Sequence, residues 1–181
     1  MPNFKKLIII AFLFSFLSES MSKEAGKISL SVPKLSEEEI ESNHIPYHMK
    51  CDACMAVAYQ IQEAFWKKEL SKKSLLKESD VIDILEHVCY KGFDEYGVKQ
   101  VEKINRLTGP GLETAHVMGM TQMGGRWPHR LQEMCHYYVG EAGEMDIYNT
   151  FHEGQLSKYL CYGKGIYSHC VQPKKPIKSD L

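Results

Sequence analysis

The chain of 181 residues lacks an excess of charge of either sign. Lys and Arg total 22 and Asp and Glu total 23, so the net charge is −1. Bulk attraction to nucleic acid or to an anionic membrane needs a surplus of basic residues, so this balance predicts neither partner. The sequence also lacks an Asn-x-Ser/Thr glycosylation acceptor, an internal repeat, a Ser-His-Asp set, a phosphate-binding loop and a calcium loop. No familiar hydrolase or nucleotide-binding class is therefore indicated.

Long hydrophobic runs are also missing. The longest, residues 7–17, has eleven residues, whereas a helix that crosses a bilayer needs about 20. Lys5 and Lys6 precede this run and the small-x-small tripeptide 18–20 follows it, which is the pattern of a cleaved signal peptide. We therefore expect residues 1–20 to be a signal peptide and the mature protein to have no membrane span.

The last four residues, Lys178, Ser179, Asp180 and Leu181, resemble the Lys-Asp-Glu-Leu signal that a retrieval receptor recognises. Ser179 departs from the acidic residue expected at that position. We expect residues 171–181 to be a disordered tail that carries this signal. The predicted location is the lumen of the endoplasmic reticulum (ER), with partial secretion.

Six cysteines, an even number, in a chain that enters the secretory pathway favour three disulfides over a metal site. Six cysteines allow about fifteen pairings, and sequence alone does not choose among them. Cys51 and Cys54 are three residues apart and share one face of a predicted helix, which favours separate bridges to two distant cysteines. A nested scheme then pairs Cys51 with Cys170, Cys54 with Cys161 and Cys89 with Cys135.

Cys51 and Cys54 also form a Cys-x-x-Cys pair, so a redox-active dithiol is the alternative hypothesis. Lys50 would favour a thiolate, but the strand and helix alternation of a thioredoxin domain is missing. A zinc site that adds His169 would need thiolates in an oxidising compartment, so we expect no metal or other cofactor. The acidic residues 37–39 and Glu41 could bind Ca²⁺ loosely, but an acidic first helical turn explains them.

Apolar residues at helical spacing predict an all-α domain. The predicted helices are residues 37–42 after a Ser36-x-x-Glu39 capping box, 49–65, 81–91, 129–139 and 144–152, and a last short helix that contains Leu156, Leu160 and Cys161. Residues 67–77 are charged and are predicted to be a connection.

The helical period is lost over residues 93–127, which we predict to be a long excursion. Glycines and methionines mark it: Gly109, Gly111, Gly124, Gly125, Met118, Met120 and Met123. Two interpretations stay open for the methionines. They either pack on the helices of the domain itself or form an adaptable surface for varied apolar partners. Residues 96–101 fit a short strand or a helix.

Several stretches together carry a family resemblance. They are residues 51–54 and 56–60, 96–98, 106–112 (Arg-Leu-Thr-Gly-Pro-Gly-Leu), 127–128, 135–137 and 147–148. With the six cysteine positions, they resemble a canopy-related family of ER proteins with a saposin-like helical fold. The resemblance covers residues 37–170. It implies a saposin-like domain over residues 36–170, stapled by three disulfides, after a flexible segment 21–35.

The resemblance implies an ER-lumenal chaperone or co-chaperone that assists the assembly and secretion of immunoglobulin, IgM above all. Its implied partners are immunoglobulin heavy and light chains and the chaperones BiP and endoplasmin. Effects on ER calcium stores and on integrin activation are also implied, as is a weak thiol-disulfide oxidoreductase activity at Cys51 and Cys54. We therefore expect a protein that is not primarily an enzyme. The alternatives are that oxidoreductase and a secreted saposin-like lipid binder.

Overall fold

The structure is a computed structural model that describes residues 32–163 and 168–170. Its helices are α2 Glu37–Glu41, α3 Lys50–Lys72, α4 Glu78–Lys91, α5 Trp127–Ala142, α6 Glu144–His152 and α7 Leu156–Tyr162, with 3₁₀ helices η1 Tyr47–Met49 and η2 Glu113–His116. The strands β1 Gly97–Val101, β2 Ile104–Thr108 and β3 Thr121–Met123 form an antiparallel sheet in the order β2-β1-β3. The sequence predicts an all-α domain; the structure confirms a mostly helical fold, adds this small sheet, and is compatible with a saposin-like arrangement.

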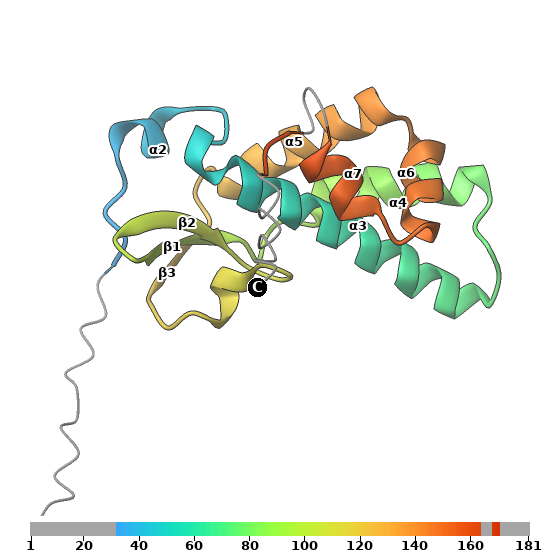
Figure 1. The fold of residues 1–181 in the computed structure, drawn as a ribbon, viewed down its shortest axis with the longest axis horizontal. Helices are drawn as coiled ribbons and strands as arrows, with labels where there is room; N and C mark the ends of the chain where they lie inside the picture. Colours follow the sequence, from blue (N-terminus) through green and yellow to red (C-terminus); the bar gives the residue numbers. More distant parts are fainter. Residues whose placement is uncertain (1–31, 164–167, 171–181) are drawn as a thin grey trace, which may run out of the picture.

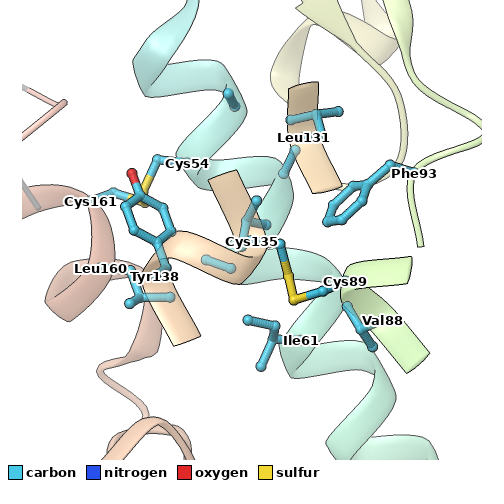
Figure 2. Packing of buried hydrophobic residues seen from close by; sticks show 14 of the residues in the cluster. Cys54, Ile61, Val88, Cys89, Phe93, Leu131, Cys135, Tyr138, Leu160 and Cys161 are labelled. Atoms are coloured by element: carbon cyan, nitrogen blue, oxygen red, sulfur yellow. A yellow bond between two sulfur atoms is a disulfide. The ribbon is translucent and has the colours of Figure 1, made fainter. Parts of the chain in front are cut away.

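The long helix α3 is the centre of the fold, and α4, α5 and α7 pack against it. Cys54, Ala58, Ile61 and Phe65 recur at three- and four-residue intervals and are all buried, so one stripe of α3 faces the core, as the periodicity predicts. Figure 1 shows the sheet at one end of the molecule and the C-terminal end of α3 at the other. Figure 2 shows the core around the disulfides, where Ile61, Leu131 and Leu160 belong to one buried cluster.

Two helices are longer than predicted. Residues 67–72 were expected in a connection but continue α3. Charged side chains are compatible with a helix as long as they lie on its solvent-exposed face, and the lysines of this stretch do. Lys73, at φ 55°, ends the helix, and its N–H donates to the carbonyl of Glu69 at 2.7 Å. The helix predicted over residues 129–139 is α5, which begins earlier, at Trp127, and runs past Gly140 to Ala142.

The start of α4 also differs from the prediction. Its first residue is Glu78 instead of Val81. Lys77 is the N-cap, and its N–H donates to the Asp80 carboxylate at 3.2 Å. Asp80 therefore stabilises the start of the helix from inside its first turn.

The prediction of a long irregular excursion over residues 93–127 is wrong in its first half. Residues 96–101 take the strand option, and β1 pairs with β2 through a two-residue turn, Glu102 and Lys103. Both turn residues have positive φ, 50° and 69°. Such turns usually carry Asn or Gly, so Glu-Lys gave no hairpin signal in the sequence.

The predicted flexible segment 21–35 is described only from residue 32. Pro33 is buried there, and the carbonyl of Lys34 accepts a hydrogen bond from Asn105 Nδ2 at 2.8 Å. The predicted signal peptide, residues 1–20, lies outside the described residues, as does the tail 171–181 with its retrieval signal. No described helix is long and apolar enough to cross a membrane.

Candidate functional site

Cys51 and Cys54 lie in the first turns of α3 and reach two different cysteines near the other end of the chain. Cys51 is bonded to Cys170 and Cys54 to Cys161, with Cα–Cα distances of 4.8 and 5.6 Å. The third disulfide joins Cys89 of α4 to Cys135 of α5, at a Cα–Cα distance of 5.3 Å (Figure 2). These are the pairs of the nested scheme; they tie α3 to α7 and to Cys170 beyond it, and α4 to α5.

The same geometry leaves no adjacent dithiol at the Cys-x-x-Cys pair. No cysteine is free, and Cys54 is completely buried. A thiol-disulfide exchange catalyst needs an accessible thiolate, or a strained bond between its two cysteines, to attack or be attacked. In this state Cys51 and Cys54 act as structural anchors of α3.

Asp52, between the two cysteines, contacts a distant motif that the sequence analysis did not connect to it. Its buried carboxylate accepts two hydrogen bonds from Arg106 of β2, at 2.6 Å from Nε and 2.5 Å from Nη2. These hydrogen bonds raise the pKa of Arg106. The pair is 54 residues apart in sequence, so no local pattern could have revealed it. It joins the Cys-Asp-Ala-Cys stretch to the Arg-Leu-Thr-Gly-Pro-Gly motif.

The Gly-Pro-Gly part of that motif packs closely on two tyrosines. A Cβ placed on Gly109 would overlap the ring of Tyr96, and one on Gly111 would overlap the ring of Tyr59. The Tyr96 hydroxyl donates to the carbonyl of Pro110 at 2.6 Å, and burial raises its pKa. This loop is therefore part of the scaffold.

A buried lysine holds the next segment, η2, against the sheet. Lys99 of β1 is 5% exposed, and its Nζ donates to the carbonyls of Thr114 at 3.0 Å and Val117 at 2.8 Å. The Thr114 hydroxyl in turn donates to the carbonyl of Leu107 at 2.6 Å. These bonds fix the point from which the chain leaves the scaffold at Val117.

Beyond that point the methionine side chains are exposed to solvent. We call residues 117–123 the methionine segment. Met118, Met120 and Met123 are 70%, 45% and 51% exposed, so the interpretation that they pack on the domain's own helices is wrong. The segment ends in β3, whose three residues are all exposed. Within the described residues β3 pairs only with β1, so its outer edge has no strand partner.

A pocket of about 550 Å³ lies beside this edge. It is lined by Gln122, Met123 and Gly124 on one side and by Leu35 and Ile40 on the other. Ile40, on α2, is half exposed. The pocket thus extends the apolar surface of the methionine segment towards α2.

The position of α2 beside the pocket depends on two buried charged residues. Arg130 of α5 stacks 4.4 Å from the centroid of the Trp127 ring and donates to the carbonyls of Glu39 and Ser42, which end α2. Glu39 accepts from the Ser36 N–H and from Asn105 Nδ2, and the predicted capping box is confirmed. Burial alone would raise the pKa of Glu39, but these hydrogen bonds and nearby His48 outweigh it and lower the pKa.

The candidate metal ligands are not brought together. Within the part of the chain that the structure describes, no group of three or more His, Cys, Asp or Glu side chains could hold an ion. Glu39, from the acidic run considered for Ca²⁺, faces Ser36 and Asn105. His169, considered for zinc, lies beside the ring of Tyr138, and its pKa is lowered by burial and by Lys50.

No protein-family model matches the chain, but curated relatives do. The chain is 40% identical over 163 residues to the "Marginal zone B- and B1-cell-specific protein" of Mus musculus, covering 85% of this chain and 87% of that protein. The protein of that name from Homo sapiens is 37% identical over 151 residues, covering 77% and 80%, and that from Bos taurus is 39% identical over 152 residues. With this identity over most of both chains, the protein belongs to the family of marginal zone B- and B1-cell-specific proteins.

Proposed function

We propose that this chain is a chaperone or co-chaperone of the ER lumen that binds incompletely folded antibody chains through the methionine segment and so assists IgM assembly and secretion. The observation that carries the proposal is the exposure of Met118, Met120 and Met123 beside the edge of β3 that no described strand pairs with. Other large apolar side chains are exposed too, among them Trp66, Leu70 and Leu75, but the three methionines are grouped on or close to the edge strand β3.

The chemistry of this surface suits unfolded clients. Thioethers on unbranched side chains adapt to apolar partners of different shape. An unpaired strand edge offers backbone donors and acceptors to any extended segment, whatever its sequence. Together they favour a partner that is extended, apolar and variable, as an unfolded antibody domain is.

The identity of the client and the location come from other observations. The relatives' name refers to marginal zone B and B1 cells, and B cells produce antibody. The family resemblance adds BiP and endoplasmin as partner chaperones. The expected signal peptide and the terminal Lys178-Ser179-Asp180-Leu181 support ER residence through the retrieval receptor. The calcium-store and integrin effects remain expectations from the resemblance, since no contact described above bears on them.

The test compares two triple variants with similar numbers of exposed apolar side chains. In one, Met118, Met120 and Met123 are each changed to Gln; in the control, Trp66, Leu70 and Leu75 at the opposite end of the molecule are changed to Gln. Binding to a reduced, unfolded antibody heavy-chain domain is measured by fluorescence anisotropy. We expect the methionine variant to bind about tenfold more weakly or worse, and the control to bind as the parent does. Equal affinities for all three proteins would contradict the proposal.

The alternative, an oxidoreductase at Cys51 and Cys54, has a separate test. Peptide mapping of the non-reduced protein is expected to recover Cys51 linked to Cys170 and Cys54 linked to Cys161. A Cys51–Cys54 bond, or free thiols at these two positions, would favour the redox function instead. No contact in the described residues favours this alternative over the chaperone.

A further inference from the structure

The far end of α3 carries a second exposed apolar surface, which the proposed chaperone function does not use. Trp66, Leu70 and Leu75 are 53%, 59% and 71% exposed. Trp66 and Leu70 are four residues apart, so they lie one turn apart on the outward face of α3. Leu75 is in the connection to α4. We call residues 66–77 the helical tip; it lies at the opposite end of the molecule from the sheet (Figure 1).

The helical tip is also strongly basic. It contains five lysines, Lys67, Lys68, Lys72, Lys73 and Lys77, and a single acidic residue, Glu69. All five lysines are exposed. Because the whole chain has a net charge of −1, the overall composition conceals this local concentration of positive charge.

Nearby carboxylates neutralise only part of it. Lys72 pairs with Asp80 at 2.5 Å, and Lys67 pairs with Glu63 at 3.6 Å across an exposed helical turn, where such pairs contribute little. Glu69 is held by Tyr148 and His152. Glu78 follows at the start of α4. Asp83 lines a pocket together with Lys67 and Lys68, and Lys68 also interacts electrostatically with Asp80.

Three lysines remain without an ion pair. Within residues 32–163 and 168–170, no carboxylate lies within ion-pair distance of Lys68, Lys73 or Lys77. Acidic residues offset their charge only at longer range, as Asp80 does for Lys68, so it remains accessible to an external partner.

We propose that the helical tip docks on membrane surfaces that contain anionic lipids. The tip projects its Trp and Leu side chains outward among lysines, so a flat surface can reach them. Trp favours the boundary between headgroups and acyl chains, and exposed Leu side chains insert just below it. Lysines around them contact lipid phosphates and carboxylates and extend their apolar stems along the membrane. The occupant that matches both the charge and the apolar side chains is therefore an anionic bilayer.

The tryptophans provide a direct readout. The chain has two, and Trp127 is only 3% exposed, so a change in emission on binding reports Trp66. The disulfide-bonded protein is titrated with phosphatidylcholine vesicles that contain roughly one-third phosphatidylserine, and with pure phosphatidylcholine vesicles, at low and at physiological salt. We expect a blue shift and co-sedimentation with the anionic vesicles, weakened by salt, and neither effect with the neutral vesicles.

Matched variants distinguish binding by the lysines of the helical tip from a non-specific effect of the protein's positive charge. Changing Lys68, Lys73 and Lys77 to Gln is expected to weaken binding about a hundredfold, since each lysine near an anionic surface accounts for about fivefold. Changing Lys91, Lys103 and Lys158 to Gln removes the same charge from exposed positions elsewhere and should change binding by less than about threefold. The Trp66, Leu70 and Leu75 variant should also lose binding, whereas the methionine variant should keep it. Circular dichroism confirms that each variant is folded.

Three outcomes would overturn the proposal. The first is no binding to anionic vesicles at low salt. The second is binding that the tip and control lysine variants lose equally. The third is binding to soluble polyglutamate but not to vesicles, lost in the tip lysine variant, which would assign the surface to an acidic protein partner. None of these results bears on client binding by the methionine segment, so the two proposals fail independently.

Discussion

The two halves of the stretch between α4 and α5 both contain glycines, but the structure uses them in opposite ways. In the first half, Gly109 and Gly111 press against Tyr96 and Tyr59 so closely that a Cβ would overlap either ring. In the second half, Gly124 and Gly125 follow the exposed β3, and a Cβ on either would meet nothing within 4 Å. The first half is a packed part of the scaffold and the second an open surface.

This difference shows where the specific family motif and the proposed function lie. Residues 106–112, which carry the resemblance, are tied to the cysteine anchors through Asp52 and Arg106, so their pattern is explained by packing. The methionine segment is held at Val117 by Lys99 and pairs with β1 through the backbone of β3, but its three methionine side chains are exposed. Because these methionine side chains are not buried against the scaffold, they are accessible to a binding partner.

The largest predicted effect compares one glycine from each half. Gly111 and Gly124 have nearly the same φ, 78° and 77°, so an alanine at either position meets the same backbone strain of about 1–2 kcal/mol. Gly111→Ala also overlaps Tyr59, and overpacking adds about 1–3 kcal/mol. Urea denaturation should therefore show Gly111→Ala as clearly less stable than Gly124→Ala. Equal losses would mean that the first half is not packed as described.

An intermediate effect tests the link between the packed half and the cysteine anchors. Asp52→Asn and Arg106→Met should each lower the free energy of unfolding by about 1–3 kcal/mol. Each change leaves one member of the pair without its charged partner. The Asp52 carboxylate is buried, but Arg106 is partly exposed, so solvent compensates for part of the loss. The double variant should lose less than the sum of the two. A double-mutant cycle measures the coupling, and strictly additive losses would show that the two side chains do not interact.

The smallest effect is a pH dependence at α2, which borders the open surface. The pKa of Glu39 lies below its ordinary value of 4.5 in the folded protein, so its contribution is present above that value and is lost as the pH falls through the lowered pKa. Glu39→Gln should cost about 1 kcal/mol at about pH 7 and less at about pH 3. Thermal unfolding at several pH values provides the comparison. A cost that is the same at both pH values would contradict this role for the carboxylate.

The features that sequence could predict depend on periodicity or on fixed spacing. The buried stripe of Cys54, Ile61 and Phe65 follows from helical period, and the Ser36–Glu39 capping box from its three-residue spacing. Helix spacing and the even number of cysteines also gave the nested pairing.

Features that depend on tertiary contacts or unusual backbone were missed. The turn of the β1–β2 hairpin consists of Glu102 and Lys103, both at positive φ, a conformation that Glu and Lys rarely adopt. The Asp52–Arg106 pair spans 54 residues. The exposure of the methionines could not be predicted either, because the same residues serve equally well as core.

Hydrogen–deuterium exchange of the disulfide-bonded protein, with and without a reduced, unfolded antibody heavy-chain domain, tests the division between scaffold and binding surface most directly. We predict that the client slows exchange over residues 117–125 and the facing part of α2, and that exchange over residues 106–112 stays as slow with the client as without it. Unchanged exchange over residues 117–125, with new protection elsewhere on the molecule, would contradict the assignment of the methionine segment as the client-binding surface.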